Sequence, residues 1–421
     1  MKALVIDHDI ARFGAALLTS SLRPSAATRL GPLKLKDLPP LELPNPDWVR
    51  ITPRMAGICG SDLATVHGKS SRWFEPIVSF PFTPGHEVVA DDQEGRRVVV
   101  EPVLGCVARG LNPVCVACAE GRLGNCERLT HGCVDAGLQT GFCCDTGGGW
   151  STEMLAHPEQ LHEVPDELSD SGAVMIEPTA CGLHAALRAQ VQPDETVVVI
   201  GAGTLGLLAI AAMNRWSPPK QLIVAAKYAH QKQFAREFSG KSAQPAVICD
   251  PRNLIRVVRS TIGTHLLSSH DSLHPEDDPH SRLSGGADVT IDCVGTASSI
   301  RTALAITRPG GRVILVGMPE VHNLDLTPLW QREISLTGAY TYGTEIIQGG
   351  PIQSFELAAE LVAAEDLGRL VSARYPLSRY PEALAHASTC GSKGGVKIAF
   401  DLLAPDYPEA PVLSTRKAAR P

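Results

Sequence analysis

Hydrophobic and polar positions follow two different patterns along this chain. Up to about residue 178 the apolar runs are short and broken by Gly, Pro and polar residues, which predicts an irregular β domain. Its expected strands include residues 2–6, 49–52 and 97–100. From residue 179 to about 343, apolar strands alternate with helical spacing, as in a parallel sheet with helices on both faces. Those strands are expected at residues 196–200, 221–225, 246–249, 288–293 and 312–316. The predicted fold class is therefore α/β, with a doubly wound parallel sheet after the β domain.

Shorter segments complete this division. An amphipathic helix is expected over residues 355–364 and a last strand over residues 395–400. Residues 404–421 are rich in Pro and Ala and are expected to form a flexible tail. Residues 264–285 contain the polar run HPEDDPHS and are expected to form a surface insertion.

A glycine-rich loop follows the first strand of the second region and opens an apolar helix. In this context the spacing G-x-G-x-x-G predicts a dinucleotide site. The first glycine permits a tight turn, the second lets a pyrophosphate approach the backbone, and the third lets helix and strand pack closely. The N–H groups at the helix start favour the phosphates. The loop consists of Gly201, Ala202, Gly203, Thr204, Leu205 and Gly206.

The next strand lacks the acidic residue that usually ends it. An Asp or Glu about 20 residues after the loop binds the ribose 2′-hydroxyl of NAD. Here Ala226 falls at that position and Lys227 follows it. The missing carboxylate removes repulsion toward a 2′-phosphate, and a lysine can pair with one, so the sequence favours NADP over NAD. A solvated Lys227 in an enzyme indifferent to the two cofactors is the alternative.

Composition narrows the possible partners and the compartment. The net charge is 38 − 45 = −7, which argues against a nucleic-acid partner. The apolar runs are too short to span a bilayer, so no membrane partner is expected. Asp7, Asp9 and Arg12 fall where a signal peptide would need an apolar core, so a cytoplasmic location with reduced thiols is expected. In that setting, 12 Cys in 421 residues suggest metal before disulfides.

Two sets of side chains have the chemistry of zinc ligands. The first is dispersed, with Cys59 in GICGSD, His86 and Glu87 in PGHE, and Glu177 before a proline. Cys, His and carboxylates all bind zinc, and a catalytic zinc keeps one position for water or substrate. The second set is local, spaced C-x8-C-x2-C-x7-C, as in a structural tetrahedral zinc site. Its members are Cys106, Cys115, Cys118 and Cys126, and we call the segment that carries them the cysteine lobe.

Taken in order, these motifs resemble the zinc-dependent medium-chain alcohol dehydrogenases, and in particular the polyol, sorbitol and glucose dehydrogenase branch. The resemblance covers about residues 1–402 and leaves out the tail and the insertion. It implies a GroES-like catalytic domain over residues 1–178, a Rossmann NAD(P)-binding domain over 179–343, and a return to the catalytic domain over 344–403. The motifs that carry it are GICGSD, PGHE, the cysteine lobe, an EP dipeptide, GAGTLG, ADVTIDCVG, PGGRVILVGMP, REISLTGAY and GGVKIAF.

The resemblance also implies roles for individual residues. Cys59 and His86 match catalytic zinc ligands, and Glu87 matches a further ligand of the polyol branch. Glu177 occupies the third protein-ligand position, which is Cys in other alcohol dehydrogenases. Cys181 is the alternative, but the register favours Glu177 and places Cys181 near the nicotinamide. Finally, Ser61 matches the hydroxyl that relays the alcohol proton.

Three departures from the family pattern stand out. The first lobe cysteine of the family is Asn112 here. Cys106 is the candidate replacement, and the alternatives are a water, another cysteine or a lobe without metal. The histidine relay of many relatives is Ala64, so His67 or a chain of waters is a candidate substitute. The third departure is the missing acid at Ala226.

The resemblance, together with the two zinc sets and the nucleotide loop, also implies a function. The expected activity is hydride transfer between a secondary alcohol, polyol or sugar and NAD(P), with a catalytic and a structural zinc. The alternatives are a zinc-free enone or quinone reductase of the same superfamily, and a non-catalytic nucleotide- or zinc-binding protein. A small-molecule alcohol or carbonyl substrate and a homodimer or homotetramer are expected. The sequence does not name the physiological substrate.

Overall fold

The computed structural model describes residues 1–20, 24–268, 281–347, 349–404 and 412–413. These residues form two compact units. The first comprises Met1–Glu177 and Ile346–Pro421, and the second comprises Pro178–Glu345. Most of the predicted flexible tail and the middle of the predicted insertion lie outside the described residues. The described ends of the insertion pair as a short antiparallel ribbon, β11 (Leu266–Leu267) with β12 (Arg282–Leu283).

The first unit is built on an eight-stranded sheet. Its strand order is β20-β18-β19-β3-β4-β5-β7, and β6 also pairs with β3. Alternating apolar residues of β3 and β4, such as Ile51 and Val88, are buried in its core. The bounds of its strands are β3 (Val49–Gly57), β4 (Val88–Asp91), β5 (Arg97–Val100), β6 (Met154–Ala156), β7 (Leu161–Glu163), β18 (Val371–Tyr375), β19 (Lys397–Asp401) and β20 (Val412–Leu413).

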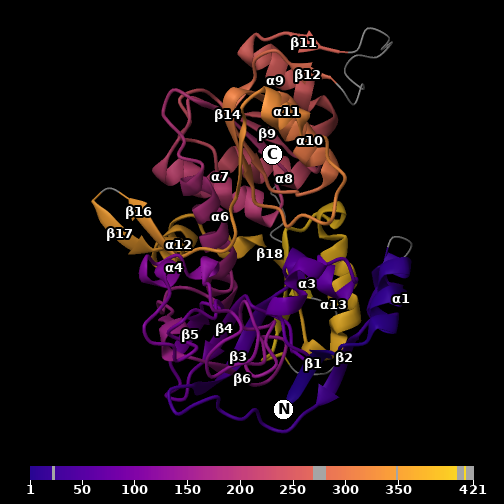
Figure 1. The fold of residues 1–421 in the computed structure, drawn as a ribbon, viewed down its shortest axis with the longest axis vertical. Helices are drawn as coiled ribbons and strands as arrows, with labels where there is room; N and C mark the ends of the chain where they lie inside the picture. The colour runs from indigo at the N-terminus through magenta and orange to yellow at the C-terminus, as the bar shows by residue number, and fades with distance from the viewer. Residues whose placement is uncertain (21–23, 269–280, 348, 405–411, 414–421) are drawn as a thin grey trace. The chain divides into compact units, whose positions relative to one another are not determined.

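Around this sheet lie a separate antiparallel pair, β1 (Lys2–Ile6) with β2 (Leu33–Asp37), and several short helices (Figure 1). Two helices that the sequence did not predict lie between β1 and β2 in the chain, α1 (Ile10–Ser20) and α2 (Pro24–Leu30). The other helices of the unit are α3 (Gly60–Val66), α4 (Val116–Ala119), α5 (Asp170–Ala173), α12 (Ser354–Ala364) and α13 (Tyr380–Ser388). A hairpin of β16 (Thr344–Ile347) and β17 (Gly350–Gln353) lies in the chain where the second unit returns to the first.

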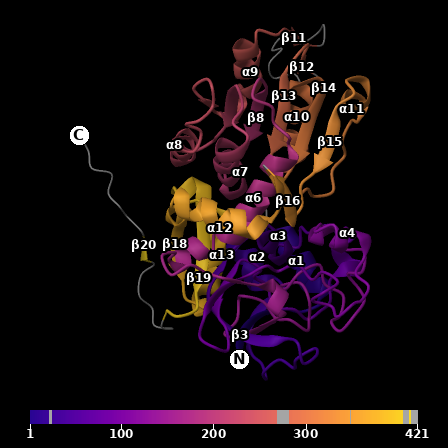
Figure 2. The same ribbon diagram turned by 90° about the vertical axis from the view of Figure 1, so that its left-hand side faces the viewer.

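The second unit holds a six-stranded parallel sheet in the order β10-β9-β8-β13-β14-β15. Its strands are β8 (Thr196–Ile200), β9 (Gln221–Ala225), β10 (Val247–Cys249), β13 (Ala287–Asp292), β14 (Thr307–Leu315) and β15 (Ser335–Gly338). The helices that accompany it are α6 (Ile176–Arg188), α7 (Thr204–Trp216), α8 (Ala229–Glu237), α9 (Leu254–Ile262), α10 (Ala297–Ile306) and α11 (Thr327–Gln331). Helices α9 and α10 share one hydrophobic core with the strands, whereas α7 packs against α8 (Figure 2).

The predicted fold class is confirmed. The strands expected at residues 2–6, 97–100, 196–200 and 221–225 coincide with β1, β5, β8 and β9. The strand expected at residues 312–316 begins earlier, at Thr307, because the chain already pairs beside β13 there, across Pro309 and two glycines.

Candidate metal and cofactor sites

The pairing of β3 with β4 brings three of the predicted zinc ligands together. Cys59 lies two residues after β3 ends, and His86 and Glu87 lie just before β4 begins. Because the strands are antiparallel, with Ala56 opposite Val88, the end of one lies beside the start of the other. The ligand atoms of Cys59, His86 and Glu87 all lie within 4.8 Å of one another. We refer to these three residues as the trio.

Cys59 stands at the N-terminus of α3. Its backbone N–H donates a hydrogen bond of 3.0 Å to Oδ2 of Asp62, which lies in the first turn of the helix. Cys59 is therefore held at a point where the backbone is fixed.

The other oxygen of Asp62 faces His86. Nδ1 of His86 lies 3.4 Å from Oδ1 of Asp62, and both residues are buried. Burial lowers the pKa of His86, but the negative charge of Asp62 and the contact with Cys59 raise it, and the resulting pKa lies well above its ordinary value. A carboxylate behind a metal-binding imidazole orients the ring and raises its basicity. The surroundings of His86 thus favour a cation at this point.

Glu87 forms a buried ion pair with Lys397, the first residue of β19. The strand register explains the contact, because β19 and β4 both pair with β3 near Gly57. Burial lowers the pKa of Lys397, but Glu87, Cys59 and Glu177 raise it, and its pKa lies above the ordinary value. A Cβ on Gly57 would lie 1.7 Å from Oε2 of Glu87, so any larger residue there would have to displace the carboxylate of Glu87.

The other predicted site residues of the catalytic and nicotinamide region lie on α3 and α6. Ser61 is half-buried in the first turn of α3, and Cys181 is half-buried in α6. Glu177 is buried in the first turn of α6 and contributes to the electrostatic environment of Lys397, but it does not belong to the trio. His67 ends α3 and is buried, with its Nε2 atom lacking a hydrogen-bond partner among the described residues.

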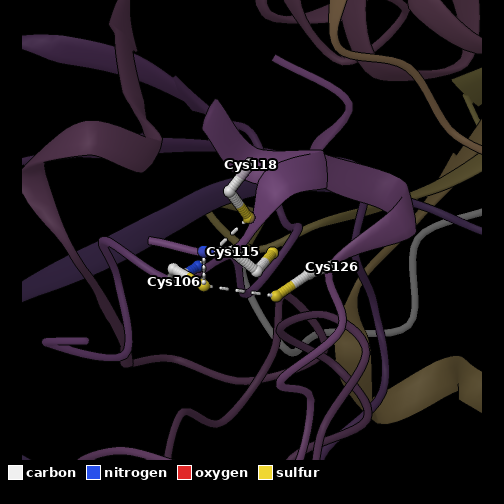
Figure 3. A group of neighbouring side chains, drawn as sticks. All are labelled: Cys106, Cys115, Cys118 and Cys126. Atoms are coloured by element: carbon white, nitrogen blue, oxygen red, sulfur yellow. Dashed lines mark hydrogen bonds between the residues drawn. The ribbon is translucent and has the colours of Figure 1, made fainter. Parts of the chain in front are cut away.

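All four predicted lobe cysteines meet in the first unit. The Sγ atoms of Cys106, Cys115, Cys118 and Cys126 lie within 4.8 Å of one another, and Figure 3 shows the four side chains pointing toward a common centre. The Sγ atoms of Cys106 and Cys126 are 3.7 Å apart. All four are free cysteines. Cys106 therefore takes the place that the family pattern gives to residue 112, where Asn112 is exposed.

The chemistry of the lobe fits a metal ion. Backbone N–H groups point at the sulfurs, with Cys115 donating to Cys106 at 3.3 Å and Arg128 donating to Cys126 at 3.4 Å. Such donors stabilise thiolates. Burial raises the pKa of Cys118, and it raises that of Cys126 to about 11. Four adjacent thiols ionise together only around a cation, and a coordinated thiol is deprotonated outright.

A buried arginine that the sequence did not single out holds the lobe. Arg109 is fully buried, three residues after Cys106. Its guanidinium ties the Cys106 segment to the chain that follows Cys126, and in doing so satisfies its own buried charge. The acceptors are the carbonyl oxygens of Leu104, His131, Val134, Asp135 and Gly137.

In the second unit, the three glycines of the loop have the expected surroundings. Gly201 follows β8 with a φ of +92°, a value that disfavours other residues. A Cβ on Gly206 would lie 1.9 Å from the carbonyl oxygen of Gly201, so glycine is required for α7 to pack on the strand. A Cβ on Gly203, the N-cap of α7, would meet nothing within 4 Å. The helix start therefore has the space that a pyrophosphate needs.

The residues expected at the adenosine ribose lie at the end of β9. The strand ends at Ala225, and the N–H of the buried Ala226 donates to the carbonyl oxygen of Cys249. Lys227 is exposed, with Nζ 5.4 Å from the centre of the Tyr228 ring. Tyr228 stacks on His230 at 5.9 Å. This corner of the sheet presents two basic side chains and an aromatic ring at the position where the usual acid is absent.

Two family models match this chain. The alcohol dehydrogenase GroES-like domain matches residues 45–166, and the zinc-binding dehydrogenase model matches residues 247–364. Together they cover more than half of the chain. The chain therefore belongs to the zinc-dependent medium-chain dehydrogenase family and is an oxidoreductase that uses zinc and a nicotinamide cofactor. The resemblance drawn from the motifs is confirmed.

The matches to individual relatives cover most of this chain and most of each relative. Sorbitol dehydrogenase of Arabidopsis thaliana is 27% identical over 86% of this chain and 91% of its own length. L-Idonate 5-dehydrogenase of Vitis vinifera is 26% identical over 90% of this chain and 94% of its own length. A Sinorhizobium meliloti 1021 protein solved with NADP bound has the same fold, with a TM-score of 0.64, 23% identity, and coverage of 88% of this chain and 96% of its own.

Among the described residues, none of the helices has the length and apolar character needed to span a membrane.

Proposed function

We propose that this enzyme oxidises a polyol, sugar or secondary alcohol, and reduces the corresponding carbonyl compound, with zinc held at the trio. The observation that carries the proposal is the convergence of the half-buried Cys59 with the buried His86 and Glu87, backed by Asp62. Two of the relatives are named for sorbitol and L-idonate. The carboxylate at residue 177, where other alcohol dehydrogenases have a cysteine, also supports the polyol branch.

The residues of the trio and those around it would have different roles in the reaction. Zinc at this point would supply Lewis-acid polarisation of the substrate oxygen, while the nicotinamide supplies the hydride chemistry. Asp62 would hold the imidazole of His86 in the orientation that leaves its other nitrogen for the metal. Ser61 would relay the proton of the alcohol, accepting it at its hydroxyl oxygen while passing its own hydroxyl proton outward toward solvent. Lys397 would neutralise the carboxylate of Glu87, and Glu177 would be the further protein ligand that the resemblance implies.

For the lobe, we propose a second zinc with a purely structural role. Four thiolates complete a tetrahedral shell and leave no position for substrate. Cys106 supplies the fourth ligand in place of the family residue at 112. This zinc would hold the loop between β5 and β6 in one conformation.

The test of the proposed activity is a substrate panel assayed with the full chain. We expect about two zinc ions per chain by metal analysis. We also expect kcat/KM for a polyol to exceed that for a simple primary alcohol by about 100-fold, because a pocket that hydrogen-bonds extra hydroxyls rejects substrates that lack them. Reduced-cofactor absorbance would measure turnover. Reduction of an enone by a zinc-free preparation, with no alcohol oxidised, would instead support the zinc-free reductase.

For the cofactor, we propose a preference for NADP. Ala226 offers no carboxylate to repel a 2′-phosphate, and Lys227 and His230 lie within the next four residues. A charge-assisted hydrogen bond from Lys227 to the phosphate would strengthen the preference.

Replacing Ala226 with Asp is expected to shift the preference toward NAD by about tenfold or more in the ratio of kcat/KM values. The new carboxylate would accept a hydrogen bond from the ribose of NAD and repel the phosphate of NADP. Steady-state kinetics with both cofactors would measure the ratio. Because Ala226 is buried, Lys227→Ala is the companion variant at an exposed position, and it should weaken NADP alone. If neither variant moves the ratio, the preference is not set at this corner of the sheet.

A further inference from the structure

The exposed face of α1 has no polar side chain. The exposed residues of this helix are Ile10, Ala11, Gly14, Leu17 and Leu18. Their spacing of i, i+1, i+4, i+7 and i+8 places them on one side of the helix. Ile10 and Leu18 are 78% and 77% exposed, and Leu17 is 50% exposed. The buried residues of α1 are Ala16 and Ser20, so the usual arrangement of a surface helix is reversed.

The helix is nevertheless firmly attached to its unit. The strands on either side of the α1–α2 segment pair with each other over their whole length. Helix α2 packs against both α1 and α13, and the ring of Phe13 lies 6.2 Å from that of Phe80. Figure 1 shows α1 at the right-hand margin of its unit. The attachment uses other residues and leaves the apolar face outward.

The charge of this segment differs from that of the whole chain. Residues 7–37 contain five basic residues and three Asp, a net charge of 5 − 3 = +2, whereas the whole chain has a net charge of −7. The positive charges of two of the five basic residues are balanced by ion pairs, because Arg12 pairs with Asp9 and Lys36 pairs with Asp7. Arg29, in the last turn of α2, is exposed. An apolar stripe thus lies within a segment that carries positive charge in an otherwise acidic protein.

We propose that α1 docks on an anionic lipid surface. A helix with an exposed apolar stripe in a basic segment lies in the plane of a membrane, with its apolar side chains among the acyl chains and its basic residues at the headgroups. A nucleic acid would use the basic residues but leave the leucines in water. The expectation of no membrane partner rested on the lack of a spanning run. A helix lying on the surface needs no such run, because it buries only one face.

The test is co-sedimentation of the full chain with phosphatidylcholine vesicles prepared with and without phosphatidylserine. We expect binding to the anionic vesicles that falls with added salt, since the headgroup attraction is screened. The double variant Ile10→Ser with Leu18→Ser should bind at least about tenfold more weakly, because two exposed apolar side chains are lost. Both residues lie outside the candidate metal and cofactor sites, so dehydrogenase activity should be unchanged.

Matched variants separate this proposal from a general effect of surface apolarity. Val321→Ser with Leu326→Ser removes two exposed apolar side chains from the second unit and should leave vesicle binding intact. Arg29→Gln should weaken binding to the anionic vesicles. The proposal is overturned if the wild-type chain does not sediment with them, or if the Ile10 and Leu18 variant binds as well as wild type. A wild-type dimer that this variant dissociates, without vesicle binding, would assign the face to a second copy instead.

Discussion

Replacing Cys59 with Ser is expected to lower kcat/KM by at least about a thousandfold. Cys59 supplies the one sulfur of the trio, and a serine hydroxyl binds zinc far less well than a cysteine sulfur does. The Lewis-acid contribution of a catalytic metal is several kcal/mol, which corresponds to this loss in rate. Steady-state kinetics with the best alcohol of the panel would measure it.

The fold and the cofactor should survive this substitution. Cys59 is at a helix N-cap, where serine is also well accepted. Melting temperature and NADP affinity should therefore stay near the wild-type values, while about one zinc ion per chain is lost. Cys144→Ser is the matched control, because Cys144 is a half-buried cysteine of the same unit outside both groups of candidate ligands. Full activity in Cys59→Ser would show that the trio holds no catalytic metal.

Replacing Cys106 with Ser is expected to remove the zinc of the lobe and to lower the melting temperature by about 10 °C. The loss of one thiolate leaves three buried sulfurs without a complete shell. A destabilisation of about 3 kcal/mol in a unit of this size corresponds to such a shift. Calorimetry together with metal analysis would measure both effects. Cys118→Ser should behave in the same way, because it removes another member of the same group.

Asn112→Ser distinguishes the two ways of completing the lobe. Asn112 has the position of the family cysteine but is exposed and outside the group of four sulfurs. Its substitution should leave the zinc content and the melting temperature unchanged. If Asn112→Ser loses the metal and Cys106→Ser keeps it, the fourth ligand has been assigned to the wrong residue.

The candidate ligands Cys59 and His86 could be identified from the sequence because each lies in a short motif. Cys59 and His86 could be named from GICGSD and PGHE, although nothing in their spacing of 27 residues shows that they meet. Asp62 lies in the same motif as Cys59 but gives no separate signal. Lys397 is more than 300 residues from Glu87, and its apolar strand offered no hint of a buried charge. The contact arises because β19 returns to pair with β3.

For helix α1, the sequence pattern does not indicate which face of the helix is buried. Its sequence, IARFGAALLTS, has the apolar positions of an ordinary amphipathic helix, and such a pattern predicts burial of the apolar face. The structure instead buries the side that carries Ala16 and Ser20, and the helix packs against α2. A periodic pattern indicates a helix, but it does not say which face meets the core.

The sequence by itself determined the fold class, the family, the nucleotide loop and the two sets of candidate ligands. These depend on residue type and on local spacing, which a chain carries in its order. The tertiary structure decided that Cys106 and not Asn112 joins the lobe, that Asp62 and Lys397 flank the trio, and that α1 turns its leucines outward. Those outcomes depend on which strand ends pair and how a loop is anchored, as Arg109 anchors the lobe, and such long-range contacts leave no periodic trace in the sequence.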